Sequence, residues 1–235
     1  MLKRRIIIGL LFKNGVLHRT KKFIPDYRYT LRFVDLTHAD EVFMIDVTPG
    51  AVFPELAFRE GIKPYVEECF TPITMGGGIK TAEGASLVLR LGGDKAIISA
   101  KRASLIPDLA FKYGSQFVTV GLDYREGEAP LEKAMEIASL GAGEILLQNI
   151  DRDGSLSGYD IPFLKKVIGG GINCPVVIGS GCSGWADMEK ALRAGADGCM
   201  TANIHHISKR AMISFKQRLY ERGVPVRNEV AANRG

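Results

Sequence analysis

The chain has 235 residues, 46% of them hydrophobic, which suffices for one large α/β domain or two small ones. Its formal charge of +5 comes from scattered lysines and arginines, without the dense basic run and interleaved aromatic residues of nucleic-acid binding, so we expect an anionic ligand instead. No apolar run approaches the roughly 20 residues that span a membrane, and the four cysteines lack the CxxC spacing of metal sites. We therefore expect a cytoplasmic protein that binds no nucleic acid, membrane, metal or cofactor.

Short apolar runs, typical of strands buried on both faces, alternate with helical patterns along the chain. The predicted strands cover residues 5–11, 42–47, 72–76, 95–99, 117–122, 144–149, 175–179 and 198–202. The predicted helices cover residues 54–68, 81–92, 104–113, 129–140, 161–169, 185–194 and 207–222. The connection 24–41 is the exception, since it holds at most a short helix around 31–37. Eight such units predict a single α/β domain over 1–235, a (β/α)8 TIM barrel whose active site lies at the C-terminal strand ends.

The two halves of the chain resemble each other. The segment at 72–100 matches the segment at 175–203, a shift of 175 − 72 = 103 residues. Gly78 then falls opposite Gly181. This spacing is too long for a solenoid repeat, so it predicts a duplicated half-barrel, with halves at roughly 1–113 and 114–235.

The duplication singles out one carboxylate. Residues 6–15 (IIIGLLFKNG) match residues 118–127 (VTVGLDYREG), and Leu11 falls opposite Asp123. Two facing carboxylates can divide general acid and base work, whereas a carboxylate facing a leucine cannot do so in the same way. Asp123 is the best candidate for acid–base catalysis, and a capping or salt-bridging aspartate is the alternative.

Two glycine-rich loops follow predicted strands and open helices, TMGGGIKT at 74–81 and its repeat mate GSGCSG at 179–184. Glycines in such loops let backbone N–H groups approach an anion. We expect phosphate or substrate to bind there, at Gly77, Gly78, Gly181 and Cys182. The alternative is that these glycines only make tight turns.

A second loop, IDRDGSLSGYD at 150–160, carries acidic residues at or just past a strand end. Asp153 and Gly154 serve either the loop turn or a ligand. Asp46 and Asp151 also lie at or just past predicted strand ends, and are weaker candidates than Asp123.

Charged residues mark the opposite ends of four strands. Arg5, Glu41, Lys95 and Glu144 all fall at predicted strand N-termini, where two cations and two carboxylates can close a ring of salt bridges. This face of a barrel usually serves stability.

With these motifs in view, the chain resembles HisF, the cyclase subunit of imidazole glycerol phosphate synthase. The resemblance spans nearly the whole length and is carried by MGGGIKT, GSQFVTVGLD, LGAGEILLQNIDRDGSLSGYD and GVPVR. It implies that a HisH-like glutaminase docks on the bottom of the barrel and that ammonia passes a four-residue gate into the barrel. The matching gate residues are Arg5, Glu41, Lys95 and Glu144, and Asp94 matches an interface aspartate.

The resemblance fails at the top of the barrel. Of the family's two catalytic aspartates, one corresponds to Asp123 and the other to Leu11. Its first-loop lysine corresponds to Arg19, and the usual long hairpin after the fifth strand is only YREGEA. Other substrate-binding positions also differ, since they read Ser99-Ala100, Gln148 and Ala202-Asn203.

The family's residues are thus kept at the N-terminal ends of the strands and changed at the C-terminal ends. This resemblance implies that the chain still takes ammonia from a glutaminase but gives it to another acceptor. The chain is most similar to divergent HisF paralogues that, with a HisH paralogue, supply ammonia for acetamidino groups on surface-polysaccharide sugars. The implied partners are a HisH-like glutaminase, a phosphorylated small-molecule or sugar acceptor, and a separate amidoligase. Two alternatives stay open: an authentic cyclase of histidine biosynthesis, and a non-catalytic ammonia conduit.

Overall fold

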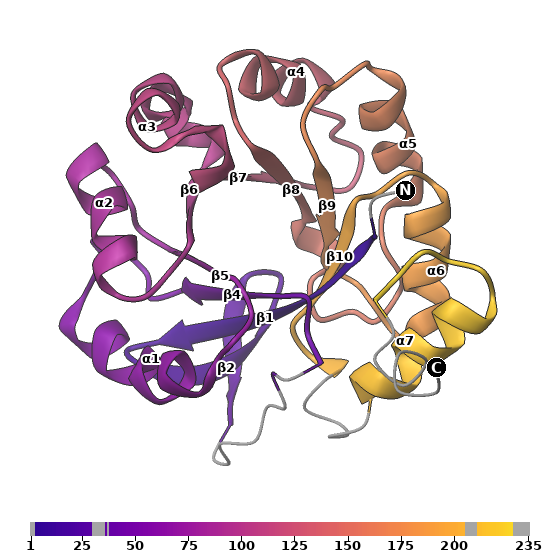
Figure 1. The fold of residues 1–235 in the computed structure, drawn as a ribbon, viewed down its shortest axis with the longest axis horizontal. Helices are drawn as coiled ribbons and strands as arrows, with labels where there is room; N and C mark the ends of the chain where they lie inside the picture. Colours follow the sequence, from indigo (N-terminus) through magenta and orange to yellow (C-terminus); the bar gives the residue numbers. More distant parts are fainter. Residues whose placement is uncertain (1–2, 30–35, 37, 205–210, 228–235) are drawn as a thin grey trace.

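Eight parallel strands close into one barrel, with helices around its outside (Figure 1). The computed structural model describes residues 3–29, 36, 38–204 and 211–227. The barrel strands are β1 (Arg5–Lys13), β4 (Glu41–Asp46), β5 (Ile73–Gly76), β6 (Lys95–Ser99), β7 (Val118–Tyr124), β8 (Glu144–Asn149), β9 (Val176–Gly179) and β10 (Gly198–Thr201). The sheet closes where β10 pairs in parallel with β1, and the predicted (β/α)8 barrel is confirmed.

The helices follow the barrel strands in the predicted order, and residues 207–210 of the last predicted helix lie outside the described residues. The helices are α1 (Leu56–Glu68), α2 (Ala82–Arg90), α3 (Ile106–Tyr113), α4 (Leu131–Ser139), α5 (Ile161–Gly169), α6 (Trp185–Arg193) and α7 (Ala211–Glu221). Short 3₁₀ turns follow β6, precede β7 and follow β8: η1 (Ala100–Leu105), η2 (Ser115–Phe117) and η3 (Ile150–Arg152). Of the short helix predicted around 31–37, only Leu36 is among the described residues, so this prediction stays untested. Among the described residues, no helix has the length and apolar character needed to cross a membrane.

A β-hairpin inserted after β1 is the main departure from the predicted elements. β1 runs on to Lys13, and β2 (Val16–Lys21) and β3 (Ile24–Arg28) extend the sheet in antiparallel pairing. The turn between β1 and β2 is Asn14-Gly15, with φ of 49° and 73°. An Asn-Gly pair is the preferred centre of a tight hairpin turn, so the signal was present in the sequence.

The apolar side chains form two cores separated by the sheet. The larger core fills the space between the strands and the helices. The smaller one fills the barrel interior and consists of Ile7, Phe43, Ile97, Leu146, Val177 and Met200. Strand side chains alternate between these two cores because successive residues of a strand point to opposite faces.

Candidate functional site

Four charged side chains form a closed ring at the N-terminal strand ends. Arg5 donates through Nη1 to Oε2 of Glu41 at 2.6 Å and through Nη2 to Glu144. Nζ of Lys95 lies 2.8 Å from Oε1 of Glu41 and 3.7 Å from Oε1 of Glu144. Each cation therefore bridges both carboxylates, and the structure brings all four residues of the expected ring together.

The carboxylates of the ring are buried, whereas its two cations are reachable from outside. Glu41 and Glu144 are 1% and 3% exposed. The side chains of Arg5 and Lys95 keep 25% and 19% of their surface exposed, and both line a depression of about 480 Å³ on the bottom of the barrel. Burial raises the pKa of Glu144, with a further rise from the neighbouring Glu41 carboxylate. The ring therefore separates solvent from the apolar interior.

Asp94, expected at a partner interface, differs from its repeat mate Asp197 in one respect. Each accepts a backbone N–H from the start of a strand, Asp94 from Ile73 at 2.8 Å and Asp197 from Val176 at 2.9 Å. Asp197 is also paired with Arg4 at 2.5 Å, whereas Asp94 has no ion pair within the described part of the chain. The second carboxylate oxygen of Asp94 thus has no partner among the described residues.

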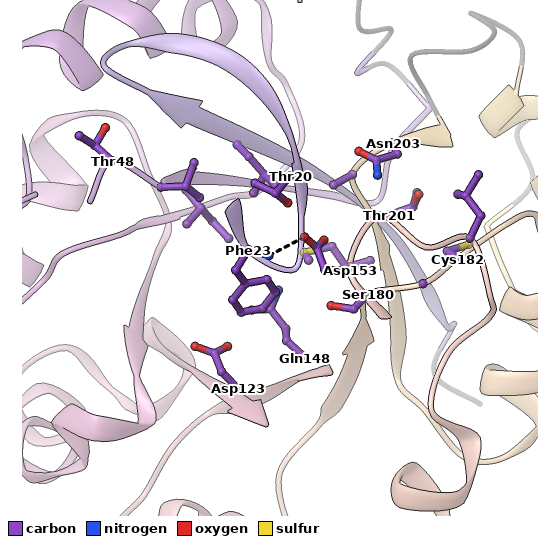
Figure 2. A pocket seen from close by; sticks show the side chains of 18 residues that line it. Thr20, Phe23, Thr48, Asp123, Gln148, Asp153, Ser180, Cys182, Thr201 and Asn203 are labelled. Atoms are coloured by element: carbon purple, nitrogen blue, oxygen red, sulfur yellow. Dashed lines mark hydrogen bonds between the residues drawn. The ribbon is translucent and has the colours of Figure 1, made fainter. Parts of the chain in front are cut away.

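At the opposite end of the barrel lies a cavity of about 300 Å³, which we call the Ser180 pocket (Figure 2). Figure 2 shows Asp123 and Gln148 on one side of it and Thr201 and Asn203 on the other. The expected substrate residues Asp153, Gly154, Gly181, Cys182, Ala202 and Asn203 all line it.

A second cavity of about 510 Å³, which we call the Lys101 pocket, adjoins the first. Asp123, Gln148 and Ile45 line both cavities. The Lys101 pocket also holds the expected residues Gly77, Gly78 and Ser99, together with the cations Lys80, Lys101 and Arg102. The two glycine-rich loops of the repeat therefore end up in two neighbouring cavities.

Asp123 stands at the C-terminal end of β7, between the two pockets. The residue keeps an exposed surface toward both pockets, while the protein packed around its carboxyl group raises the pKa to about 6, because partial burial outweighs the opposing effect of Lys101. Leu11 contributes an aliphatic wall to the Ser180 pocket. A carboxylate with this pKa is mostly ionised at neutral pH and is suited to accept a proton.

The two glycine-rich loops share one backbone conformation. Gly77 and Gly78 have φ of 101° and 74°, and their repeat mates Ser180 and Gly181 have φ of 66° and 91°. A Cβ on Gly181 would lie 2.4 Å from the Gly158 carbonyl oxygen, so only glycine fits there. A serine in this region costs roughly 1 kcal/mol or more, a strain that is typical of functional sites.

Ser180 is a candidate that sequence reasoning missed. Its hydroxyl oxygen is buried and has no hydrogen-bond partner among the described residues, and the same holds for Oδ1 of Asn203. Both residues line the Ser180 pocket. Buried polar atoms are nearly always paired, so these two are suited to meet a ligand. The sequence signal for this residue is that Ser180 occupies the repeat position at which the first half has a glycine.

Asp153 holds the hairpin against the barrel mouth. Its carboxylate accepts the Phe23 N–H at 3.0 Å, and its carbonyl oxygen accepts the Lys22 N–H at 3.2 Å. Gly154 packs against the same hairpin, since a Cβ there would lie 2.5 Å from the Thr20 carbonyl oxygen. Burial raises the pKa of Asp153. Asp153 thus builds the pocket wall as well as lining it.

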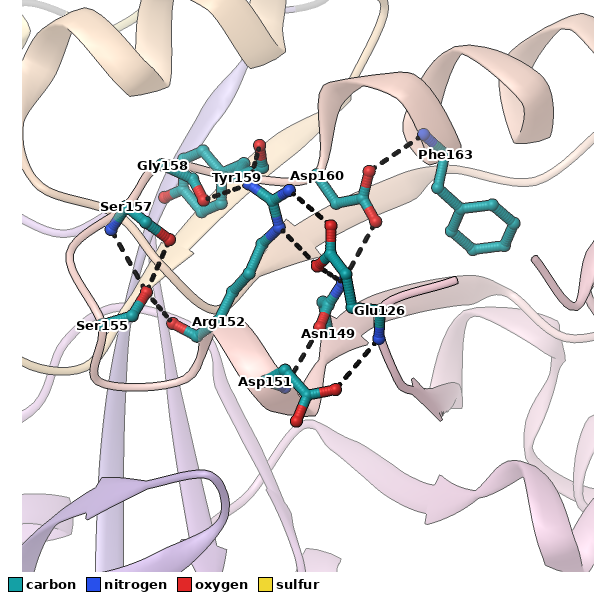
Figure 3. A network of polar contacts seen from close by, with 10 residues as sticks. All are labelled: Glu126, Asn149, Asp151, Arg152, Ser155, Ser157, Gly158, Tyr159, Asp160 and Phe163. Atoms are coloured by element: carbon teal, nitrogen blue, oxygen red, sulfur yellow. Dashed lines mark hydrogen bonds and ion pairs between the residues drawn. The ribbon is translucent and has the colours of Figure 1, made fainter. Parts of the chain in front are cut away.

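The short loop after β7 is fastened by a polar network (Figure 3). Arg152 donates to both carboxylate oxygens of Glu126, at 3.2 and 3.0 Å, and to the carbonyl oxygens of Gly158 and Tyr159. Asp151 accepts the Glu126 N–H at 3.0 Å, so it serves this network instead of either pocket. Bidentate pairs of this kind fix geometry, and here they fix the loop that follows Asp123.

The chain matches the family model described as "Histidine biosynthesis protein" over residues 11–210. It is 34% identical to a Campylobacter jejuni protein whose name provisionally assigns it as subunit hisF2 of imidazole glycerol phosphate synthase, over 97% of this chain and 99% of that one. It is 33% identical to imidazole glycerol phosphate synthase subunit HisF of Hyphomonas neptunium, over 97% and 99% of the two chains. The corresponding subunit of Alkaliphilus metalliredigens is 32% identical over 97% and 100%.

Proposed function

Because the chain belongs to the HisF family of histidine biosynthesis proteins, we propose that it is the barrel subunit of a glutamine amidotransferase. It receives ammonia from a HisH-like glutaminase at the bottom of the barrel and delivers it to an acceptor at the top. The single observation that carries this proposal is the closed ring of Arg5, Glu41, Lys95 and Glu144 beneath an apolar interior.

The ring and the interior suit ammonia as cargo. Ammonia is small and neutral, so crossing the apolar layer costs it far less than it costs an ion. The ring cations reach the bottom depression, so a docked partner that rearranges them would open the way inward. Asp94, with its unpaired oxygen, supports docking on the same face.

The acceptor differs from that of an imidazole glycerol phosphate synthase, in our proposal, because Leu11 stands where the second catalytic aspartate is expected. General acid–base groups contribute typically 10²–10⁴-fold to rate, so their loss changes the chemistry that is possible. Asp123 remains as the proton acceptor for attacking ammonia, and the glycine-rich loops bind phosphate. We propose a phosphorylated or sugar acceptor that gains an acetamidino group, with a separate amidoligase.

The names of the relatives favour a second candidate, an authentic cyclase of histidine biosynthesis. The two candidate functions can be distinguished in a histidine-requiring strain that lacks its cyclase. Expression of this chain is expected to leave the strain unable to grow without histidine, and robust growth would establish the cyclase reading.

Association with the glutaminase is tested directly. The chain should co-purify with a HisH-like glutaminase of the same organism and should stimulate its glutamine hydrolysis. Absence of a complex would refute the proposal. The alternative of a passive ammonia conduit is tested with the Asp123→Asn variant in that complex. If product formation does not change, Asp123 has no chemical role and the barrel only conducts ammonia.

A further inference from the structure

A lysine lines the same pocket as the carboxylate that the top of the barrel retains. Lys101 and Asp123 line the same pocket, and the ammonium group of Lys101 is near enough to lower the pKa of Asp123 against the larger effect of burial. Within the described residues Lys101 has no ion pair and no side-chain hydrogen bond. Its ammonium group therefore remains available to a ligand bound in this pocket.

The end of a barrel strand positions the backbone of Lys101. Ser99 ends β6, and its hydroxyl accepts the Lys101 N–H at 3.3 Å, which starts η1. Ser99 lies beside Gly121 in the β6–β7 register, and Asp123 follows two residues later on the same face of β7. The lysine and the carboxylate are therefore delivered to one opening by adjacent strands.

The charges around Asp123 are unbalanced. Lys80, Lys101 and Arg102 line the Lys101 pocket, and Asp123 is its one acidic residue among those described. Asp153 shares only the other pocket with Asp123 and is turned toward the hairpin. An excess of positive charge beside backbone N–H groups selects an anionic ligand.

We propose that Lys101 is the second ionisable group of this site, the charge partner of Asp123 and a direct ligand of the phosphate group of an anionic acceptor. The site then pairs a carboxylate with a cation that follows the adjacent strand, where a HisF-type site is expected to oppose it with a second carboxylate. The part that concerns an acceptor rests on the proposed function, whereas binding of phosphate and charge coupling to Asp123 do not.

The test needs neither the partner nor the acceptor. Inorganic phosphate is titrated into the full chain, and binding is followed at the amide signals of Gly77 and Gly78, which report the Lys101 pocket and not the Ser180 pocket. We expect Lys101→Met to weaken this binding about tenfold and Lys101→Arg to restore it to within about threefold, since charge-assisted contacts are worth roughly that factor.

The second readout is the pKa of Asp123, measured from its side-chain carboxyl carbon signal, with Asp123→Asn for assignment. Removing a nearby cation destabilises the carboxylate, so Lys101→Met should raise this pKa by about half a unit or more, and Lys101→Arg should not. Lys80→Met is the matched control from the same pocket, and it should weaken phosphate binding while leaving the Asp123 pKa unchanged.

Three outcomes would overturn the inference. They are unchanged phosphate binding in Lys101→Met, an unchanged pKa of Asp123 in that variant, or an equal pKa change in Lys80→Met. A failure to bind glutaminase would instead refute the proposed function and leave the result for Lys101 standing.

Discussion

Asp123 and Leu11 define the chemistry of this barrel at the level of single residues. They occupy matching positions of the two halves and line the same cavity, so one half supplies a proton acceptor and the other an aliphatic surface. The retained carboxylate is held in surroundings that disfavour its charge, with a pKa of about 6. A site of this kind costs the fold some stability.

That cost predicts the pH dependence of stability. A carboxyl group whose pKa is higher in the folded than in the unfolded chain stabilises the fold below the unfolded value, and this contribution is lost as pH rises from about 3.8 to about 6. Asp123→Asn should therefore unfold at higher urea than the native chain at pH 7, by about 1 kcal/mol once screening by pocket water is allowed for. At pH 3.5 the difference should vanish. If the Asp123→Asn variant and the native chain have the same free energy of unfolding at pH 7, the ionised Asp123 carboxylate does not destabilise the fold.

At the level of elements, loops from distant parts of the chain fasten one another around the pockets. The hairpin after β1 is fixed by Asp153 from the loop after β8, and the loop after β7 is fixed by Arg152. The hairpin turn at Lys22 and Phe23 has φ of 52° and 63°, which non-glycine residues adopt rarely. Its two N–H groups find acceptors on Asp153, and this offsets the strain.

Asp153→Ala removes the acceptor for the Phe23 N–H and keeps the backbone acceptor for Lys22. Hydrogen exchange at Phe23 should accelerate about tenfold, the equivalent of roughly 1.4 kcal/mol for a charge-assisted bond, and less at Lys22. Asp26→Ala, which removes an exposed pair with Arg19 on the same hairpin, is the control and should leave Phe23 exchange unchanged. Equal protection in both variants would contradict the fastening role.

Across the whole molecule, the two ends of the barrel serve different tasks. The bottom is a network in which two buried carboxylates share two cations, and the top is an open pair of pockets. The apolar interior and the barrel strands lie between these ends, so we expect the effects of substitutions at the two ends to be additive.

The bottom network makes a stability prediction. Glu41→Gln leaves Arg5 and Lys95 with one carboxylate, and breaking a largely buried network should cost about 2–4 kcal/mol, seen as a lower thermal midpoint. Glu136→Gln is the control, because its pair with Lys133 is exposed and should contribute under about 1 kcal/mol. If both variants have the same thermal midpoint, the ring contributes no more stability than a surface ion pair.

Local patterns in the sequence were sufficient for the barrel and for much of its ends. Apolar runs and helical spacing reflect short-range geometry, so the eight strands and seven helices were predicted to within a few residues of their observed bounds. The starts of strands also located the ring residues, because all strands of a parallel barrel begin at the same end. The Asn14-Gly15 hairpin was readable but was not predicted.

Contacts between distant segments were decided by the tertiary structure alone. That Asp153 holds the hairpin, that Arg152 binds Glu126, and that Lys101 shares a pocket with Asp123 depend on how strands pair and where loops end. Periodicity constrains which face a side chain occupies, but the closing of the sheet sets its neighbours across the barrel. The sequence by itself thus determined the barrel and the ends at which its charged and glycine-rich groups lie, and folding determined which of those groups meet.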